Sequence, residues 1–566
     1  KKSKLIFFGG PVLVIILATA LYASVLKTKK IDVEEELATG LTPGTEAVEE
    51  EEQESPPEEA EAINLAAIGA IDAYRISADQ ISKANLANQL AARRTVLAKT
   101  IRLGNLPLVE KMLLSAEHLA AVPAELASEV EKSVVLSGEL WTIHQDQGKE
   151  ANGEIQLVRS KNKRQLIVGD QSYNVFLPQH LDSNEVSPNV SPRAKVDLTG
   201  IALRDDILAK PENISQTADL LPPALLPVTN GAAKPTKVAL VLVNFSKRDE
   251  FITVAAAKEK IFGLDGEKNV HGWYRRHSFG QVSFLGHNSP EGDVFGFVTV
   301  PNPGNRCQLG KITLDVLAAL ASDPATRWPG IEKYRAAIFV LPSSGCPFLV
   351  GAASGMVAWV SGPVGFASTS LTAHEMGHIF GLGHASSASR AKAQGQWKVE
   401  NEYGDPNDVM GNGRGAFHVY HQQKLGYSLP NNIKVVDKTG SFTLERAEKE
   451  SAEVKYLRVP ILAHQTLDGL FPGTPEVGLE YRGSSGAVIV RLETHPAVDT
   501  HGPVLVRTLK EGKVLDDIAD SGLKITYLSR VNNKANVEVV VSQPTCIRDI
   551  PGIVASPVSQ VGRKGK

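Results

Sequence analysis

The chain has 566 residues, of which 42% are hydrophobic and 22% are charged, an ordinary composition for a globular protein of several domains. Its net charge of −3 combines an acidic segment at 31–61, which holds 13 of the 63 acidic residues and no Lys or Arg, with a mildly basic remainder. Because nucleic-acid binding needs a strongly basic surface, we exclude a nucleic-acid partner.

Residues 5–26 carry no charged side chain and predict a membrane-spanning helix. At 1.5 Å per residue this stretch is about 33 Å long, enough to cross the bilayer core. We interpret residues 1–30 as a signal-anchor. The alternative is a cleaved signal peptide, since Ala18-Thr19-Ala20 resembles a cleavage site. We therefore expect a membrane-anchored protein whose main domains are extracytoplasmic, or a secreted protein that is extracellular or periplasmic.

Two segments of different composition follow the apolar stretch. Residues 31–62 are rich in Glu and Pro and predict a disordered acidic linker. Residues 63–133 predict helices, because apolar side chains recur on one helix face at Leu86, Leu90, Leu97 and Ile101.

The pattern changes again before the middle of the chain. Residues 134–208 show strand patterns and predict a small β-domain, and the prolines of residues 209–235 indicate a linker. Four roles remain open for the N-terminal half: a latency pro-region, a targeting module, a scaffold or a simple spacer.

Residues 236–430 alternate strand and helix patterns and contain the most specific motif of the chain, H-E-x-x-H-x-x-G-x-x-H. On a helix, His374 and His378 share one face and can ligate the same ion. Gly381 can adopt a positive φ and end the helix, which would bring His384 back as a third ligand.

The residue types of this motif favour a catalytic Zn²⁺ site. Zinc binds neutral imidazole nitrogens, and three protein ligands leave a fourth position for water. Glu375 follows the first ligand and can accept a proton from a water molecule that the metal activates. The sequence therefore predicts zinc held by three histidines, with Glu375 as general base and acid.

A methionine turn is predicted shortly beyond the motif. The segment Asp408-Val409-Met410-Gly411 suits this role, with Met410 as an apolar floor beneath the ligands. The extended motif followed by such a turn resembles that of the metzincin metallopeptidases.

Further sequence segments restrict this resemblance to one family. Similarity to the gametolysin family, peptidase M11, extends over about residues 235–545 and rests on the zinc motif together with residues 237–245, 272–281, 402–411, 424–427 and 479–482. The resemblance implies a zinc metalloendopeptidase with a twisted mixed sheet and an active-site helix, acting on protein or peptide substrates. In metzincins an edge strand pairs with extended substrate, and the segment at 355–360 is the candidate for it.

The positions of the three cysteines indicate the redox compartment and limit how a pro-segment could inhibit the protein. Cys307 and Cys346 fall in two loops of the same region and are candidates for a disulfide in an oxidising compartment, with free thiols as the alternative. Cys546 would be left over. Residues 1–306 contain no cysteine, so a pro-segment that inhibits through a cysteine is excluded by count.

Residues 431–545 are rich in strand patterns and predict a C-terminal β-sandwich-like domain, and residues 546–566 predict a basic tail. The fold class is accordingly multidomain α+β. Two minor sites stay open. Asp405, Asn407 and Asp408 suit Asx turns, with calcium ligation as the alternative. His418 and His421 suit core or surface roles, with contact to a transition state as the alternative.

Two functions compete at this point. The motif predicts a zinc endopeptidase that hydrolyses extracellular or cell-envelope proteins. The alternative is a surface adhesion or binding protein whose peptidase fold is catalytically idle, which the long non-catalytic flanks suggest. Metal content and proteolytic activity distinguish the two.

Overall fold

The computed structural model describes residues 56–542, apart from residues 152–153, 179–192, 220–233, 246–250, 267, 304–306, 345, 347–348, 363, 391–396, 414, 461–473, 496–502 and 518–521. The predicted anchor at residues 5–26, the first part of the predicted acidic linker and the predicted tail at 546–566 lie outside the described residues. Among the described residues, no helix combines the length and the hydropathy that a membrane crossing requires.

The described part of the chain opens with helices: α2 (Pro57–Ile76), α3 (Gln80–Arg102), α4 (Leu106–Met112), α5 (Ala116–Ala121) and the 3-10 helix η1 (Ala124–Glu129). α2 begins inside the segment predicted as acidic linker. A proline at the first helical position and the acidic Glu58 and Glu59 in the first turn favour a helix start there. Asp79 caps α3 by accepting a hydrogen bond of 2.7 Å from the Ser82 N–H.

Five strands follow: β1 (Lys132–Ala151), β2 (Glu154–Val168), β3 (Gln171–Phe176), β4 (Arg193–Leu203) and β5 (Asp206–Asp219). β5 continues well into the predicted linker at 209–235, because it pairs with β4 as far as Asp219. The register of this pair shifts between Leu198 and Gly200, opposite Pro211. Proline has no N–H to donate and is tolerated at such an irregularity, which explains how a strand can contain it.

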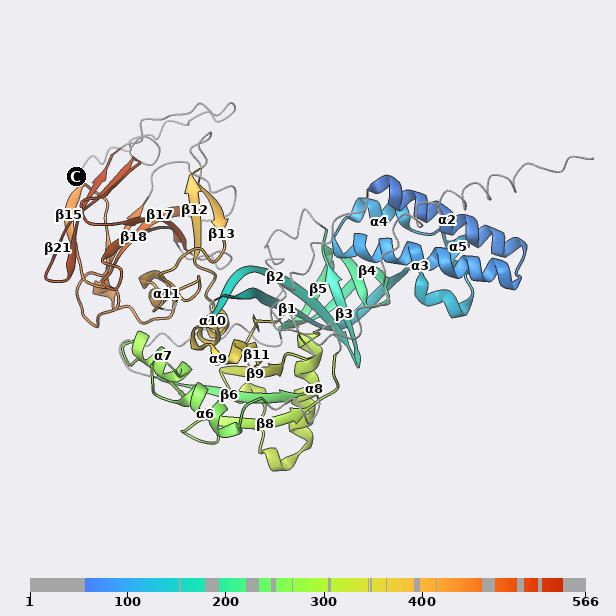
Figure 1. Ribbon diagram of the computed structural model, residues 1–566, viewed down its shortest axis with the longest axis horizontal. Helices are drawn as coiled ribbons and strands as arrows, with labels where there is room; N and C mark the ends of the chain where they lie inside the picture. Colours follow the sequence, from blue (N-terminus) through green and yellow to red (C-terminus); the bar gives the residue numbers. More distant parts are fainter. Residues whose placement is uncertain are drawn as a thin grey trace, which may run out of the picture. The chain divides into compact units, whose positions relative to one another are not determined.

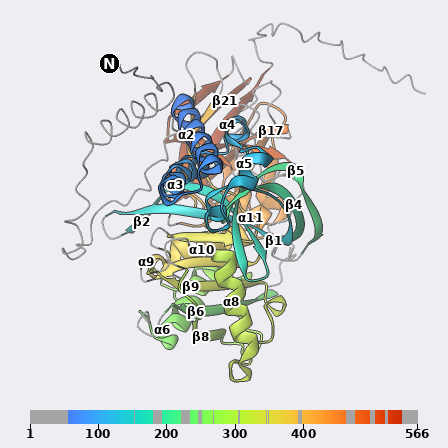
Figure 2. The ribbon, with the colours of Figure 1, turned by 90° about the vertical axis from the view of Figure 1, so that its right-hand side faces the viewer.

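The middle of the chain alternates strands with helices (Figure 1). Its strands are β6 (Lys234–Asn244), β7 (Val282–Leu285), β8 (Asp293–Thr299), β9 (Ala336–Pro342), β10 (Gly351–Ser354) and β11 (Val357–Gly362). Its helices are α6 (Val254–Phe262), α7 (Val270–His277), α8 (Leu309–Ser322), α9 (Val364–Ala367) and α10 (Thr369–Ile379). In Figure 2, α8 runs in front of strands β9, β6 and β8.

The strands of the first half and the middle of the chain form one sheet of eleven described strands. Its order is β2-β3-β5-β4-β1-β10-β11-β9-β6-β7, and β8 also pairs with β6. β9 and β11 are buried along their whole length, as expected for strands covered on both faces. β1 therefore connects the predicted small β-domain directly to the strands that the motif helix α10 contacts.

The C-terminal part contains β14 (Ile433–Val435), β15 (Gly440–Leu444), β16 (Tyr456–Pro460), β17 (Thr474–Arg482), β18 (Ala487–His495), β19 (Val504–Leu509), β20 (Val514–Asp517), β21 (Leu523–Val531) and β22 (Lys534–Val541). One sheet has the order β13-β12-β19-β18-β17-β16-β14 and the other β15-β22-β21-β20. Their apolar side chains share one core, so the two sheets pack face to face. The first sheet recruits β12 (Ser386–Arg390) and β13 (Trp397–Asn401), which precede the methionine-turn segment in the chain.

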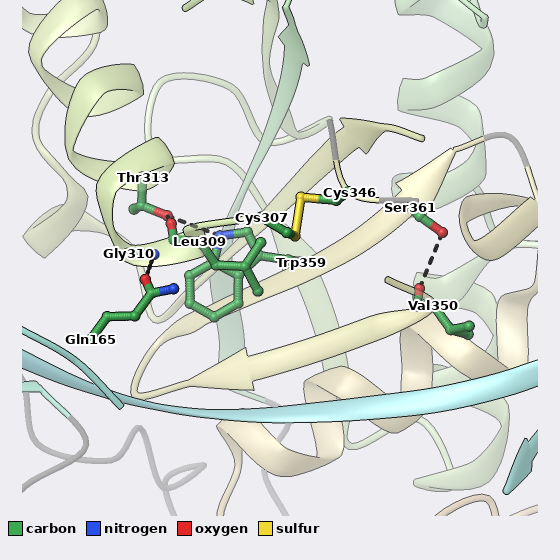
Figure 3. The surroundings of a disulfide bond; sticks show 9 residues. All are labelled: Gln165, Cys307, Leu309, Gly310, Thr313, Cys346, Val350, Trp359 and Ser361. Atoms are coloured by element: carbon green, nitrogen blue, oxygen red, sulfur yellow. Dashed lines mark hydrogen bonds between the residues drawn. A yellow bond between two sulfur atoms is a disulfide. The ribbon is translucent and has the colours of Figure 1, made fainter. Parts of the chain in front are cut away.

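A disulfide joins Cys307 to Cys346, with their Cα atoms 4.8 Å apart (Figure 3). It lies beside Trp359 of β11, whose indole N–H donates to the Thr313 hydroxyl of α8 at 2.9 Å. The bond thus fixes the loop before α8 to the loop before β10, close to the strand that leads into the motif helix.

Candidate active site

Helix α10 presents the motif as the spacing predicts. Its N-terminus is capped by Ser368, whose side chain accepts a hydrogen bond from the Leu371 N–H at 3.2 Å. The helix ends at Ile379, and Gly381 follows with a φ of +85°, a conformation that favours glycine. The chain then turns back and carries His384 to the helix face that holds His374 and His378.

Three imidazole nitrogens converge at this face. The Nε2 atom of His378 lies 3.1 Å from Nε2 of His374 and 3.1 Å from Nε2 of His384. Each ring has an acceptor at its other nitrogen: the Nδ1 atoms of His374, His378 and His384 lie 2.7 Å from the Val409 carbonyl, 2.9 Å from the Leu382 carbonyl and 2.7 Å from the Glu402 carboxylate.

These partners determine the tautomer of each ring. A carbonyl or carboxylate oxygen accepts the proton of Nδ1, so each ring, when neutral, has its lone pair at Nε2. Three lone pairs then face one another at hydrogen-bonding distance with no proton between them. Such a cluster is repulsive unless a cation lies at its centre, and the donor set therefore fits a metal ion.

Strand β1 brings two further donors to the same point. Asp146 is buried, and its Oδ2 atom lies 3.1 Å from Nε2 of His374 and 3.7 Å from Nε2 of His378. Its Oδ1 atom lies 3.4 Å from Nε2 of His384. Nε2 of His144 is 3.2 Å from that same oxygen. Oδ2 of Asp146 has no hydrogen-bond partner among the described residues, as expected of an oxygen that faces a cation.

Glu375 lies beside this cluster and is fully buried. Neither of its carboxylate oxygens has a hydrogen-bond partner within the described part of the chain. Burial, followed by the negative charge of Asp146, raises the pKa of Glu375 well above its usual value. A Cβ atom at Gly351 of β10 would lie 1.8 Å from Oε1 of Glu375, so glycine is needed where this strand passes the carboxylate.

The methionine-turn segment packs against helix α10 through Met410 and Val409. Met410 is fully buried, and its sulfur would meet a Cβ atom at Gly377 within 2.4 Å. The Met410 carbonyl accepts a hydrogen bond of 2.9 Å from the Ala385 N–H, next to His384. The preceding carbonyl, that of Val409, is the partner of His374. The segment therefore orients two of the three histidines without supplying a ligand.

A buried polar network holds this segment in place. Asp408 accepts hydrogen bonds from the Met410 N–H at 2.7 Å and the His418 N–H at 2.6 Å, and its Oδ2 atom lies 3.1 Å from Nδ1 of His421. Burial alone would raise the pKa of Asp408, but the charges of His421 and His418 and these hydrogen bonds hold it well below its usual value. His418 and His421 are thus core residues, stacked 4.1 Å apart, and lie outside the histidine cluster of α10.

The acidic residues before Met410 form turns and an ion pair. Oδ1 of Asp405 accepts a hydrogen bond of 2.8 Å from the Asn407 N–H, an Asx turn. Oδ2 of Asp405 receives a bond of 2.7 Å from Nε of Arg491 on β18. These partners attach the loop to the C-terminal sheet.

The segment at 355–360, predicted as the substrate-binding edge strand, is in the interior of the sheet. β11 pairs with β10 on one side and with β9 on the other, so this prediction is wrong. The strand at the motif side is β10, which contacts α10 and whose outer side pairs with β1. A run of apolar residues could indicate a strand, but only its pairing partners decide whether that strand lies at an edge.

His144, Asp146 and Glu402 also belong to this site, although the sequence did not predict them there. One signal was available: His144 and Asp146 alternate along a strand pattern and therefore share a face. Nothing in their spacing connects that face to a motif more than 200 residues away, since the connection comes from the pairing of β1 with β10.

Comparison with known proteins agrees with this geometry. Residues 250–467 match the family model described as gametolysin peptidase M11. No curated protein matches the chain. The matched segment contains α10, the three histidines, Glu375 and Met410, whereas His144 and Asp146 lie outside it. The match confirms the resemblance indicated by the sequence: residues 250–467 are similar to the gametolysin M11 peptidases, and this similarity indicates a metallopeptidase.

Proposed function

We propose that this chain is a zinc-dependent endopeptidase of metzincin type that hydrolyses peptide bonds of extracellular or cell-envelope proteins. One observation supports this most strongly: the Nε2 atoms of three histidines converge beside a buried glutamate in a region that matches a peptidase family. A surface adhesion protein has no need for that combination.

The donor set suits zinc. Two ligands held at 2.0–2.1 Å from a zinc ion at the tetrahedral angle are about 3.3 Å apart. The distances of 3.1 Å between the Nε2 atoms of the histidine pairs are close to this value. The Nδ1 hydrogen bonds orient all three rings, as second-shell partners of zinc ligands do.

A zinc ion held by His374, His378 and His384 would supply Lewis-acid chemistry, which acidifies water and polarises a carbonyl group. Glu375 acts as the general base: a carboxylate oxygen accepts the proton of the attacking water and then delivers it to the leaving amine. The backbone groups of β10 that pair with β1 in this structure would, once free, pair with an extended substrate and hold the scissile bond beside Glu375. Met410 and Gly377 keep the ligand-bearing helix in place.

We infer a location outside the cytoplasm for the catalytic domain, secreted or held by the N-terminal apolar segment. The Cys307–Cys346 disulfide supports this, because disulfides persist in oxidising compartments. The apolar stretch at residues 5–26 supports it through its length and its flanking lysines.

Casein hydrolysis by the full chain tests the proposal. It is measured before and after limited trypsin digestion, with the trypsin then blocked by a serine-peptidase inhibitor. We expect hydrolysis that a chelator abolishes and that zinc restores. Glu375→Gln should bind zinc in the same amount and lose roughly 10²–10⁴-fold in rate, because it lacks the general base. An equal rate for this variant, or hydrolysis that the chelator leaves intact, contradicts the assignment.

A further inference from the structure

The hairpin of strands β1 and β2 covers the site. β1 pairs antiparallel with β10 through His144 and Ala353, Gln145 and Ala352, and Asp146 and Gly351. These β10 residues carry the backbone groups that an extended substrate would use. A substrate strand and β1 therefore cannot occupy β10 at the same time.

Asp146 also occupies the position that a catalytic site keeps open. Its oxygens lie 3.1–3.7 Å from the Nε2 atoms of His374, His378 and His384, the spacing of a fourth ligand beside three others. The Tyr403 hydroxyl donates to its Oδ1 atom at 2.6 Å and holds the carboxylate in this orientation. With a carboxylate in the fourth position, water has no ligand site opposite Glu375.

β2 fixes the hairpin to the surroundings of the motif helix. The Ser160 N–H donates to Glu402 at 3.0 Å, and Glu402 is also the partner of His384. The Leu157 N–H donates to Asn412, just beyond the methionine turn, at 3.1 Å. The Leu157 side chain belongs to a small buried cluster with Leu371 of α10 and Tyr403.

The hairpin shares its apolar core with the peptidase region. Trp141 and Ile143 of β1 are buried in the same cluster as the residues of β6, β9 and β11. Oε1 of Gln165 on β2 accepts a hydrogen bond of 2.9 Å from the Gly310 N–H at the start of α8 (Figure 3). These contacts oppose spontaneous release of the hairpin.

We propose that the β1–β2 hairpin is a built-in inhibitor of the peptidase, with Asp146 as the fourth metal ligand and β1 in the position of the substrate strand. This inference rests on the proposed function. It selects the latency role among those open for the N-terminal half, and it uses a carboxylate where residues 1–306 contain no cysteine. Activity then requires the hairpin to leave β10, which a cut of the chain between β5 and β6 permits.

The experiment places the recognition sequence of a site-specific protease in residues 220–233 and cuts the folded, zinc-loaded chain there. Hydrolysis of a quenched peptide is followed while the cut protein is diluted, and sedimentation measures dissociation of the two pieces independently. We expect the uncut chain to be inactive and the rate per molecule to rise as the pieces separate. Asp146→Ala should raise their dissociation constant about 10-fold or more, because a metal ligand is lost. Asp146→Asn, which keeps the shape, should act in the same direction.

A spectroscopic measurement tests the ligand without activity. Cobalt(II) in the uncut chain should change its visible absorption spectrum when Asp146 is replaced. Glu139→Ala is the matched control: Glu139 is on the same strand, bonds to Arg193 at 2.9 Å and should leave dissociation and spectrum unchanged.

The outcomes separate the two proposals. An uncut chain as active as the separated peptidase piece, or an unchanged cobalt spectrum in both Asp146 variants, overturns the inhibitor and leaves the peptidase standing. Separation and a spectrum that depend on Asp146, without hydrolysis in any form, support the ligand assignment and contradict the proposed function instead.

Discussion

Helix α10 and strand β1 both bring side chains to one cluster of candidate metal ligands, but they do so by different physical routes. His374 and His378 are neighbours because a helix repeats every 3.6 residues, so their proximity is local. His144 and Asp146 arrive from a strand that pairs with β10, more than 200 residues along the chain. Local geometry thus builds the part of the site to which we assign the chemistry, and long-range strand pairing builds the part that we propose blocks it.

Removing a candidate ligand from helix α10 should have the strongest effect of the changes considered. His378→Ala should lose the metal, and with it the stabilisation that binding provides, about 4 kcal/mol when metal exceeds its Kd 1,000-fold. Metal content by mass spectrometry and thermal unfolding with and without chelator measure both effects. His287→Ala, which changes an exposed histidine contacting Lys237, should keep full metal content. A His378→Ala protein that still holds one equivalent would place the metal elsewhere.

Glu402 contacts both regions, because its carboxylate binds His384 and also accepts a hydrogen bond from Ser160 of β2. Glu402→Gln should weaken metal binding by roughly 10–100-fold, since the carboxylate orients His384. Ser160→Ala removes only the hydroxyl contact of β2 with Glu402 and should leave metal affinity nearly unchanged. Competition with a fluorescent chelator measures both affinities. Equal losses in the two variants would mean that Glu402 acts through the hairpin and not through His384.

Gly381 tests the turn that returns the third histidine. Its φ of +85° is unfavourable for a residue with a Cβ atom, so Gly381→Ala should lower the free energy of unfolding by about 1–2 kcal/mol. Urea unfolding of the metal-free protein measures this effect. Gly415→Ala is the control, because a Cβ atom there would meet nothing within 4 Å. If both variants lose the same stability, the backbone conformation at residue 381 is not the cause.

A weaker effect is expected from removing the hydrogen bond between Tyr403 and Asp146. Tyr403→Phe removes one buried hydrogen bond of 2.6 Å and should lower the stability of the β1–β10 pairing by about 1 kcal/mol. Hydrogen exchange of the amides at 144–146 should become roughly fivefold faster, which is the same free energy expressed as a rate. Tyr173→Phe alters a tyrosine near the surface of β3 and should leave this exchange unchanged. An unaltered rate in Tyr403→Phe would show that the backbone pairing alone holds β1.

Much of the peptidase region follows from local rules. Ser368 starts the helix, Gly381 ends it, and both act through contacts within a few residues. Met410 could be assigned from its distance to the motif, although its contact with Gly377 required the structure. The helical segment and the strand-rich C-terminal region could likewise be identified from periodicity.

Other features could not be obtained from local patterns. The start of α2 among acidic residues, the extension of β5 beyond Pro211 and the interior position of β11 all depend on what each segment packs against or pairs with. The role of Glu402 depends in the same way on the nearness of His384 and Ser160.

The sequence was enough to predict that His374, His378, His384 and Glu375 lie together, because a fixed spacing on one helix and turn brings these groups to one place. The tertiary structure was needed to show that Asp146 lies against the same histidines and that β1 pairs with β10. The local sequence of a strand does not select its neighbour, because its backbone hydrogen bonds can be satisfied by whichever strand edge the whole fold brings to it.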